Sequence, residues 1–379
     1  YIHVPFCEHK CIYCDFYSIA PNGNGKADFE GLIPEFLAAL KTEITLRGRD
    51  PRFASRYDTV FFGGGTPSLL DPSNIAEILA LFSETFSLDP QVEVTLETNP
   101  GTVDLRKLAG FREAGVNRVS IGIQSFHEDD LKFLTRIHSA DQARDCVRNA
   151  YGAGINNVSL DLIFSLPGQT PDRWCANLEE AMKLGPTHIS CYSLTVEPNT
   201  PLSRMVAQKQ VTPLPRDEDA ELYAFTTEFL ERHGYEQYEV SNFCRPGHQS
   251  RHNKKYWDHS NYLGFGPSAH SFWNGTRWWN LSNVSGYAQR LRAEVLPTAG
   301  EEILTAEQRW EEEVFLGLRS SGIDLVRIRE RYDGDVPERV GTMIEGLVKD
   351  RLATTADGHF RLTSKGYALC DEICCAFIE

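Results

Sequence analysis

Long hydrophobic runs are missing from this sequence of 379 residues. Its longest apolar stretches are strand-sized, such as TVFFGGG, and fall far short of the roughly 18 residues that a membrane-spanning helix needs. We therefore expect any membrane association to come only through partners. The sequence begins at Tyr1 inside a strand-like run, with neither an initiator methionine nor a signal peptide, so we expect further residues to precede it in the natural protein.

Positive charge is scarce. The chain has 38 lysines and arginines against 53 aspartates and glutamates, which gives a formal net charge of −15. Nucleic acids and anionic membranes attract basic surfaces, so this balance argues against non-specific binding to either. We expect no nucleic-acid partner.

The cysteines lack the regular spacing of a disulfide framework. Small secreted proteins carry such frameworks, whereas a chain of this size with irregular cysteines is typical of a reducing compartment. We expect a cytoplasmic protein, or an organellar one in a eukaryote, in which some of the thiols serve a metal. The ten cysteines are Cys7, Cys11, Cys14, Cys146, Cys175, Cys191, Cys244, Cys370, Cys374 and Cys375.

Strand-like runs alternate with helix-sized segments over the first 200 residues, which predicts a parallel sheet. Six such repeats suit a doubly wound sheet or a partial (β/α)6 barrel, and both place their ligands at the carboxyl ends of the strands. A helix is expected from Asp71 and Pro72, an N-cap followed by proline. The predicted strands are 1–6, 57–65, 92–98, 116–125, 155–167 and 188–198.

The character of the sequence changes twice after the alternating part. We expect three domains: residues 1–200 as the α/β barrel, 201–295 as an aromatic-rich extension, and 296–379 as a C-terminal α+β domain. In the last of these, helices surround two short strands joined by a turn at Asp357 and Gly358. That order predicts a winged-helix-like domain.

Three cysteines stand within eight residues, in the segment CEHKCIYC (7–14). Structural zinc sites have four ligands, so zinc would have to recruit His3 or His9. Thiolates also suit an iron–sulfur cluster, where three cysteines on four irons leave one iron open. Buried core cysteines are a third interpretation, but packing does not explain such tight spacing. Cys370 and Cys374 lie one helical turn apart, a spacing that suits two metal ligands but is more typical of core packing.

The CxxxCxxC motif with Tyr13 before its last cysteine resembles that of the radical S-adenosylmethionine (radical SAM) enzymes. The resemblance implies a 4Fe–4S cluster on Cys7, Cys11 and Cys14, with SAM on the open iron. GGGTPS (63–68) is similar to the family's glycine motif. The positions that the resemblance assigns to SAM are Tyr1, Tyr13, Gly64, Gly65, Thr66, Glu97, Gln124, Arg136 and Asp161.

YIHVPFC, GVNRVSIGIQSF and LDLIFSLPGQT resemble one subfamily over essentially the whole chain: oxygen-independent coproporphyrinogen III oxidase and the related HemW-type heme chaperones. True oxidases carry a fourth cysteine where this chain has Phe16. HNKKYW (252–257) matches the HNxxYW signature of the chaperones. The resemblance favours a heme chaperone that delivers heme to apo-proteins, with the oxidase as the alternative. A radical SAM methyltransferase or heme-degrading relative is a third possibility, and whether the chain is an enzyme stays open.

Heme contacts are expected in the aromatic-rich extension, since imidazole is a common axial ligand of heme iron. The resemblance places His252, Asn253, Tyr256 and Trp257 in the heme motif. The expected recipients are respiratory cytochromes or other heme enzymes, and a homodimer is possible. The further candidate ligands are His248, His259, His270 and Cys244.

Overall fold

The main sheet has eight strands in the order β1-β2-β3-β4-β5-β6-β8-β7 in this computed structural model, which describes residues 1–21, 29, 31–331 and 338–378. Neighbouring strands from β1 to β6 pair in parallel, and β8 and β7 extend the sheet with antiparallel pairing. The strands are β1 (Ile2–Val4), β2 (Arg56–Gly64), β3 (Ser87–Thr98), β4 (Arg118–Gln124), β5 (Asn157–Phe164), β6 (His188–Ser193), β7 (Glu236–Gln237) and β8 (Asn242–Cys244).

Helices follow the parallel strands, so the predicted (β/α)6 partial barrel is confirmed. The order β1 to β6 follows the chain, as in a barrel, rather than reversing as in a doubly wound sheet. No helix in the described parts of the chain is long and apolar enough to cross a bilayer. The helices of this half are α1 (Leu32–Gly48), α2 (Pro72–Thr85), α3 (Leu105–Ala114), α4 (Glu128–Phe133), α5 (Ala140–Gly152), α6 (Pro171–Leu184), α7 (Pro201–Ala207) and α8 (Arg216–Arg232), with short 3-10 turns at Pro51–Phe53 and Pro67–Leu69.

Local sequence explains where these helices begin. Helix α2 starts at Pro72, as expected, and the Asp71 backbone N–H donates to Asn74 Oδ1 at 3.1 Å. Proline at a first helical position loses no hydrogen bond, because that N–H has no partner within the helix. The apolar side chains of the barrel strands, such as Val119 and Ile121 of β4, point away from the barrel interior and pack in the main hydrophobic core. The alternate residues Arg118 and Ser120 face the barrel interior.

The segment after β8 closes one side of the barrel. It comprises α9 (Arg251–Trp257), the strands β9 (His270–Trp273), β10 (Thr276–Asn280) and β11 (Thr298–Ile303), and α10 (Val284–Arg292). The three strands form an antiparallel sheet in the order β11-β10-β9. Phe265 forms a parallel bridge to Ile2, which extends the hydrogen bonding beyond β1.

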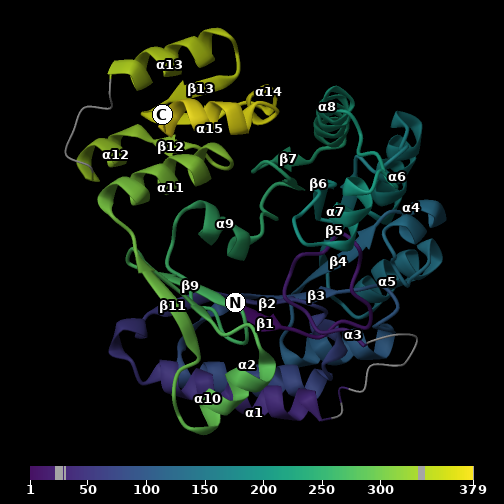
Figure 1. Cartoon of the computed structure of the whole chain (residues 1–379), viewed down its shortest axis with the longest axis vertical. Helices are drawn as coiled ribbons and strands as arrows, with labels where there is room; N and C mark the ends of the chain where they lie inside the picture. Colours follow the sequence, from purple (N-terminus) through teal and green to yellow (C-terminus); the bar gives the residue numbers. More distant parts are fainter. Residues whose placement is uncertain (22–28, 30, 332–337, 379) are drawn as a thin grey trace.

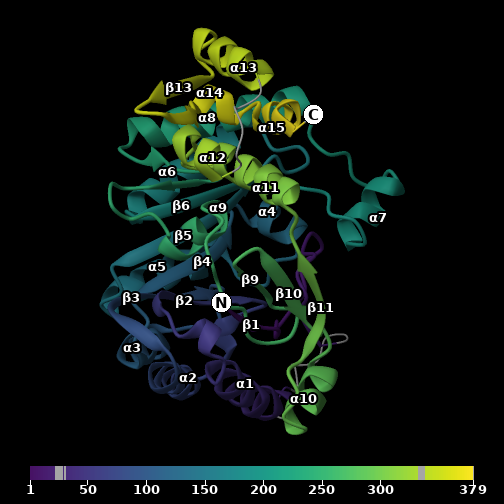
Figure 2. The same cartoon turned by 90° about the vertical axis from the view of Figure 1, so that its left-hand side faces the viewer.

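A buried carboxylate fixes this segment to α1. Glu43 is fully buried and accepts hydrogen bonds at 2.8 Å from the Gly266 N–H, Asn280 Nδ2 and the Tyr287 hydroxyl. Three donors on one buried carboxylate replace the water that it loses. Figures 1 and 2 both show α10 lying beside α1 at one end of the molecule.

The C-terminal helices gather at the opposite end of the molecule from α1, α2 and α10 (Figure 1). They surround a three-stranded sheet in the order β12-β14-β13 and enclose a separate hydrophobic core around Phe360. The predicted winged-helix-like arrangement of helices and a β-hairpin is confirmed. The elements are α11 (Ala306–Leu318), β12 (Ile323–Asp324), α12 (Leu325–Arg331), α13 (Glu338–Lys349), β13 (Ala353–Ala356), β14 (His359–Leu362), α14 (Ser364–Tyr367) and α15 (Cys370–Ile378).

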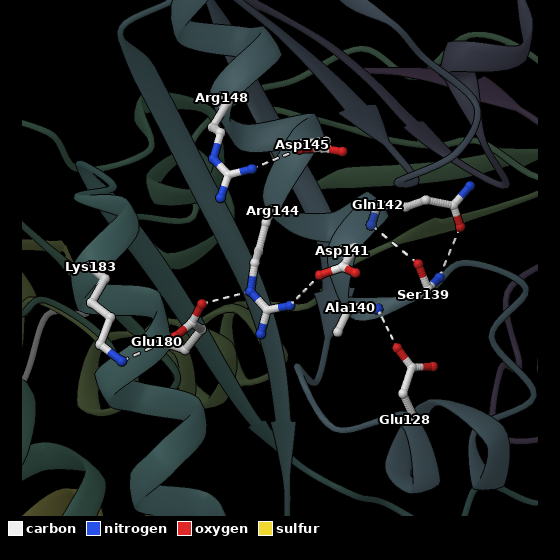
Figure 3. A network of polar contacts seen from close by, with 10 residues as sticks. All are labelled: Glu128, Ser139, Ala140, Asp141, Gln142, Arg144, Asp145, Arg148, Glu180 and Lys183. Atoms are coloured by element: carbon white, nitrogen blue, oxygen red, sulfur yellow. Dashed lines mark hydrogen bonds and ion pairs between the residues drawn. The ribbon is translucent and has the colours of Figure 1, made fainter.

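Ion pairs join neighbouring helices on the outside of the barrel. Arg144 of α5 contacts Asp141 at 2.8 Å and Glu180 of α6 at 2.6 Å, as Figure 3 shows. Lys183 also contacts Glu180, at 3.2 Å. Helix α5 begins with a capping box, in which the Ser139 hydroxyl accepts from the Gln142 N–H and the Gln142 side chain accepts from the Ser139 N–H.

Candidate cluster and cofactor site

The loop of three cysteines leaves the carboxyl end of β1 and is fixed at several points. The Cys7 N–H donates to the Ile19 carbonyl at 2.9 Å, which joins the two ends of the loop. Farther along, the Ile12 N–H donates to the Thr135 hydroxyl at 3.2 Å, and the Ile12 carbonyl accepts from the Leu202 N–H at 2.9 Å. The loop is therefore held between β1, the end of α4 and the start of α7.

A cavity of about 610 Å³ opens beside this loop, over the carboxyl ends of the strands. All three motif cysteines line it, and so does Phe16 in the position of the oxidases' fourth cysteine. The structure brings every predicted SAM residue to the same cavity, although they come from seven different segments of the chain. These residues are Tyr1, Tyr13, Gly64, Gly65, Thr66, Glu97, Gln124, Arg136 and Asp161.

The thiols have no disulfide partner and are held by polar neighbours. The Thr66 hydroxyl donates to Cys7 Sγ at 3.6 Å, and Arg136 donates to Cys11 Sγ at 3.5 Å. Burial raises the pKa of Cys7, and it raises that of Cys14 to about 11. Iron would therefore displace protons from these thiols on binding, as thiolate ligation generally requires.

The donor set fits a cluster better than a single ion. In the described residues no three histidine, cysteine or acidic side chains converge tightly enough to hold one metal ion. A cluster asks for wider spacing, since each cysteine holds a different iron. His3 is not turned toward the cysteines, because its Nε2 bonds the Tyr17 carbonyl at 2.8 Å and its Nδ1 bonds the Tyr1 hydroxyl at 3.0 Å.

The glycine motif provides bare backbone at the cavity wall. Gly64 has a φ of +110°, and a Cβ atom there would lie 2.6 Å from the His3 ring. A Cβ atom on Gly65 would lie 2.6 Å from the Phe6 carbonyl oxygen. The Gly64 N–H donates to Glu97 Oε2 at 3.1 Å, so the motif also orients the predicted ribose-binding carboxylate. Only glycine fits both positions without displacing a neighbour.

Backbone strain occurs at a predicted site residue. Gln124 ends β4 at a φ of +68°, where the register with β5 shifts. A non-glycine residue in this region costs free energy and is common at functional sites. The strain turns the chain at the cavity edge.

Arg136 joins three parts of the site, and one of its partners was missed by sequence reasoning. Besides Cys11, its guanidinium donates to the Gly122 carbonyl at 2.7 Å and to Asn99 Oδ1 at 2.6 Å. Asn99 Nδ2 in turn donates to the Thr66 hydroxyl at 2.9 Å. The signal was available, since Asn99 follows Glu97 by two residues at the same strand end.

Two carboxylates, Glu97 of β3 and Asp161 of β5, line the cavity on either side of β4. Burial and the charge of Asp161 raise the pKa of Glu97 to about 7. Burial also raises the pKa of Asp161, although the Ser120 hydroxyl donates to it at 3.0 Å. Arg118, also missed by sequence reasoning, lies below them with 1% of its surface exposed and favours the ionised form of both. The sequence offered one signal for Arg118: in a strand, residues two positions apart face the same side, so Arg118 and Ser120 point into the same cavity.

The HNxxYW segment forms α9, and its residues face different surroundings. Asn253 and Tyr256 line the cluster cavity, whereas His252 is 2% exposed and borders a separate cavity of about 180 Å³. The Thr59 hydroxyl bonds His252 Nδ1 at 2.9 Å, and the Tyr256 hydroxyl bonds Nε2 at 3.0 Å. Trp257 is half-buried at the end of the helix.

The other candidate heme ligands are spread over the aromatic-rich extension. Cys244 is fully buried in β8. His259 bonds Glu312 of α11 at 3.1 Å and stacks on Phe272, while His270 is exposed and stacks on Trp279. His248 is half-buried in the turn before α9. The structure therefore does not bring these side chains together.

The C-terminal cysteines belong to the second core. Cys370 Sγ and Cys374 Sγ lie 3.9 Å apart, and Arg319 donates to Cys374 at 3.2 Å. Both thiols are buried, at 3% and 1% exposure, and pack with Phe377 and Ile373. Core packing explains the spacing of this pair.

Comparison with known proteins agrees with the resemblance to the radical SAM superfamily and the heme chaperones. Residues 1–181 match the model of the radical SAM superfamily, and residues 304–369 match the HemN C-terminal domain. The heme chaperone HemW of Bacillus subtilis is 33% identical over 100% of this chain and 98% of its own. The chain belongs to the HemW family. The HemW of Mycobacterium tuberculosis is 37% identical over 94% of this chain and 91% of its own.

The fold of this HemW-family chain also matches a solved structure. Escherichia coli HemN, described as a coproporphyrinogen III oxidase and radical SAM enzyme, superposes with a TM-score of 0.83 over 99% of this chain and 88% of its own. The two sequences are 23% identical, so this likeness concerns the fold alone. A zebrafish relative described as a mitochondrial radical SAM domain-containing protein is 40% identical over 71% of this chain and 59% of its own.

Proposed function

We propose that this protein is a heme chaperone that binds heme and delivers it to apo-proteins, and that it carries a 4Fe–4S cluster and a SAM site. The observation that carries the proposal is the single cavity that joins three cysteines, the glycine motif and the HNxxYW helix. Its three thiols leave one iron for SAM, and Phe16 stands where a fourth cysteine would be. The heme chaperones named above share most of this chain's length.

Several residues of the cavity have specific roles in this proposal. Cys7, Cys11 and Cys14 hold the cluster, and Arg136 compensates their negative charge. When bound, the cluster and SAM supply a site for one-electron chemistry or a sensor of redox state. Gly64 and Gly65 admit the methionine end of SAM to the backbone, and Glu97 accepts hydrogen bonds from the ribose hydroxyls.

Heme is the cargo, and we assign its contacts to the surface around α9. Trp257 is half-buried at the end of this helix. Farther along the aromatic-rich extension, on β9, His270 offers an exposed imidazole that stacks on Trp279. The recipients in this proposal are respiratory cytochromes or other heme enzymes, and the chaperone itself acts in the cytoplasm, or in an organelle in a eukaryote. Membrane association comes only through these recipients, and a homodimer is part of the hypothesis.

The alternative function is oxidative decarboxylation of coproporphyrinogen III, which the resemblance of the sequence motifs to the oxygen-independent oxidases implies. The first experiment is anaerobic incubation of the cluster-loaded protein with coproporphyrinogen III, SAM and a strong reductant. We expect an intact cluster and no conversion of the porphyrinogen. Catalytic accumulation of protoporphyrinogen would establish the oxidase instead.

Heme transfer is tested in the same preparation. We expect heme to bind with a shift of its Soret absorption band and to move to an apo-cytochrome after mixing. A protein that neither binds heme nor converts the porphyrinogen would refute both functions.

A further inference from the structure

Helix α9 places two residues of the HNxxYW motif beside different cavities. Tyr256 faces the cluster cavity, and His252 lies behind it, 2% exposed, with its ring stacked on Phe61 at 5.0 Å. The cavity that His252 borders has a volume of about 180 Å³. Sites for ligands of drug size measure roughly 300–1,000 Å³, so this space is too small for a porphyrin.

Both nitrogens of His252 are already used. Nδ1 bonds the Thr59 hydroxyl of β2 at 2.9 Å, and Nε2 bonds the Tyr256 hydroxyl at 3.0 Å. A neutral imidazole has one donor and one acceptor, and two hydroxyl groups satisfy it completely. Burial lowers the pKa of His252 well below its usual value, in keeping with a neutral ring. Binding iron would break one of these hydrogen bonds and expose a buried ring.

Tyr256 is fixed in orientation by its neighbours. Its ring meets those of His252 and Tyr262 edge-on, with centroids 5.2 and 4.8 Å apart. Burial, together with the nearby Tyr1 and Tyr262 phenols and the Glu97 carboxylate, raises the pKa of Tyr256 well above its usual value. Its hydroxyl is therefore neutral, and once Nε2 is satisfied it retains hydrogen-bonding capacity for a ligand beside Tyr1 and Glu97.

We propose that Tyr256 contacts the nucleoside part of SAM, and that His252 is a positioning residue that holds the Tyr256 hydroxyl toward the cavity from its anchor on Thr59. This inference rests on the proposed SAM site. It differs from the iron-ligand role that the motif led us to expect for His252. It also gives the motif a physical link between the surface around α9 and the cluster cavity.

The test is a SAM titration of the reduced, cluster-loaded protein, followed by the change in the electron paramagnetic resonance spectrum of the cluster. Tyr256→Phe should weaken SAM binding about fivefold, the usual effect of one lost hydrogen bond. His252→Gln and the milder Thr59→Val should weaken it in the same direction. The double variant Tyr256→Phe/His252→Gln should be no weaker than the worse single variant, because both changes act through one hydroxyl.

Tyr262→Phe is the matched control, since this phenol touches Tyr256 but lines the neighbouring cavities. It should bind SAM as the unchanged protein does. Heme titrations of His252→Gln should show the unchanged axial-ligand spectrum. Thermal unfolding identifies a variant that has lost its fold, in which case Thr59→Val decides.

Two results would overturn the inference while leaving the proposed function standing: unchanged SAM affinity in Tyr256→Phe, or loss of the axial-ligand spectrum in His252→Gln with unchanged SAM affinity. If the unchanged protein shows no spectral response to SAM, the proposed SAM site itself fails and the inference falls with it.

Discussion

Charged side chains on the outside of the barrel wall form ion pairs, whereas two charged side chains on the inside form none with the described residues. Outside, Arg144 and Glu180 satisfy one another across α5 and α6 at 2.6 Å, and both remain partly exposed (Figure 3). Inside, Glu97 accepts from the Gly64 N–H but has no ion-pair partner within 4 Å among the described residues. Arg118 lies below it and is almost fully buried. Arg118 likewise makes no ion pair with any residue that the structure describes.

This difference separates groups that stabilise the fold from groups kept for a ligand. Exposed ion pairs contribute little free energy, because water and salt screen them. A buried polar group without a close partner costs stability unless a ligand later satisfies it. The interior residues are therefore expected to affect binding, and the exterior ones only stability. The following changes test that division.

The largest expected effect is loss of the cluster. Cys11→Ala removes one of the three proposed iron ligands and leaves Arg136 without its sulfur partner. We expect the visible absorption of the iron–sulfur cluster to disappear after anaerobic reconstitution. Cys175→Ala, on the outer helix α6, is the control and should keep the full absorption. Equal absorption in both variants would move the cluster to another site.

The next effect concerns close approach of the backbone. Gly65→Ala places a Cβ atom 2.6 Å from the Phe6 carbonyl oxygen, so β1 and the start of the cysteine loop must move. Overpacking of this kind costs about 1–3 kcal/mol of stability. If the displaced backbone loses the same free energy in its contacts with SAM, the affinity falls by roughly five- to 150-fold. The measurement is again the SAM titration. Gly31→Ala, where a Cβ atom meets nothing within 4 Å, should bind SAM normally.

Many residues of this site were predictable, because each belongs to a short motif that can be read in the sequence. The strand–helix alternation predicted the barrel, and the motifs predicted residues that the structure brings to one cavity, with Cys7, Cys11 and Cys14 among them. The cluster itself stays a prediction. The sequence does not show which motif residues share a cavity, so His252 and Tyr256 looked equivalent although they border different cavities. Arg118 and Asn99 were missed because their roles depend on neighbours from other strands.

A smaller effect should appear as pH dependence of SAM binding. In the proposed SAM site the ribose hydroxyls donate to Glu97, and the ionised carboxylate is the form that accepts both. Because the pKa of Glu97 is raised to about 7, this group takes up a proton as the pH falls through neutrality. We expect SAM affinity to fall about tenfold between pH 8 and pH 6, in proportion to the ionised fraction. Glu97→Gln should bind more weakly and lose this dependence.

Glu97 should also make the stability of the ligand-free protein depend on pH, in the opposite direction to SAM affinity. Its pKa is about 7 in the folded chain against an ordinary value of 4.5, so the folded state holds the proton more tightly. The contribution of Glu97 to stability is therefore present at acid pH and is lost as the pH rises from about 4.5 to 7. Glu97→Gln should flatten this part of the stability profile in thermal unfolding. A parallel pH profile in both proteins would contradict the assignment.

The smallest effect belongs to the outside of the wall. Arg144→Ala removes contacts to Asp141 and Glu180, and we expect a loss of about 0.5–1 kcal/mol in the free energy of unfolding. The Arg144 guanidinium lowers the pKa of Glu180, so the contribution is present at neutral pH and fades as the pH falls through the pKa of Glu180 in the folded chain. It should also shrink in high salt. Urea unfolding measures each difference.

Arg148→Ala is the matched control on the same helix. Arg148 pairs with Asp145 at 2.7 Å, but both side chains are 64% exposed, so no measurable loss is expected. Arg144→Ala should leave SAM affinity unchanged, because it alters only the outer surface of the barrel. If this variant weakens SAM binding as much as Tyr256→Phe, then the outer helices set the shape of the cavity. Changes on the outer surface of the barrel would in that case alter the cavity as strongly as changes inside it.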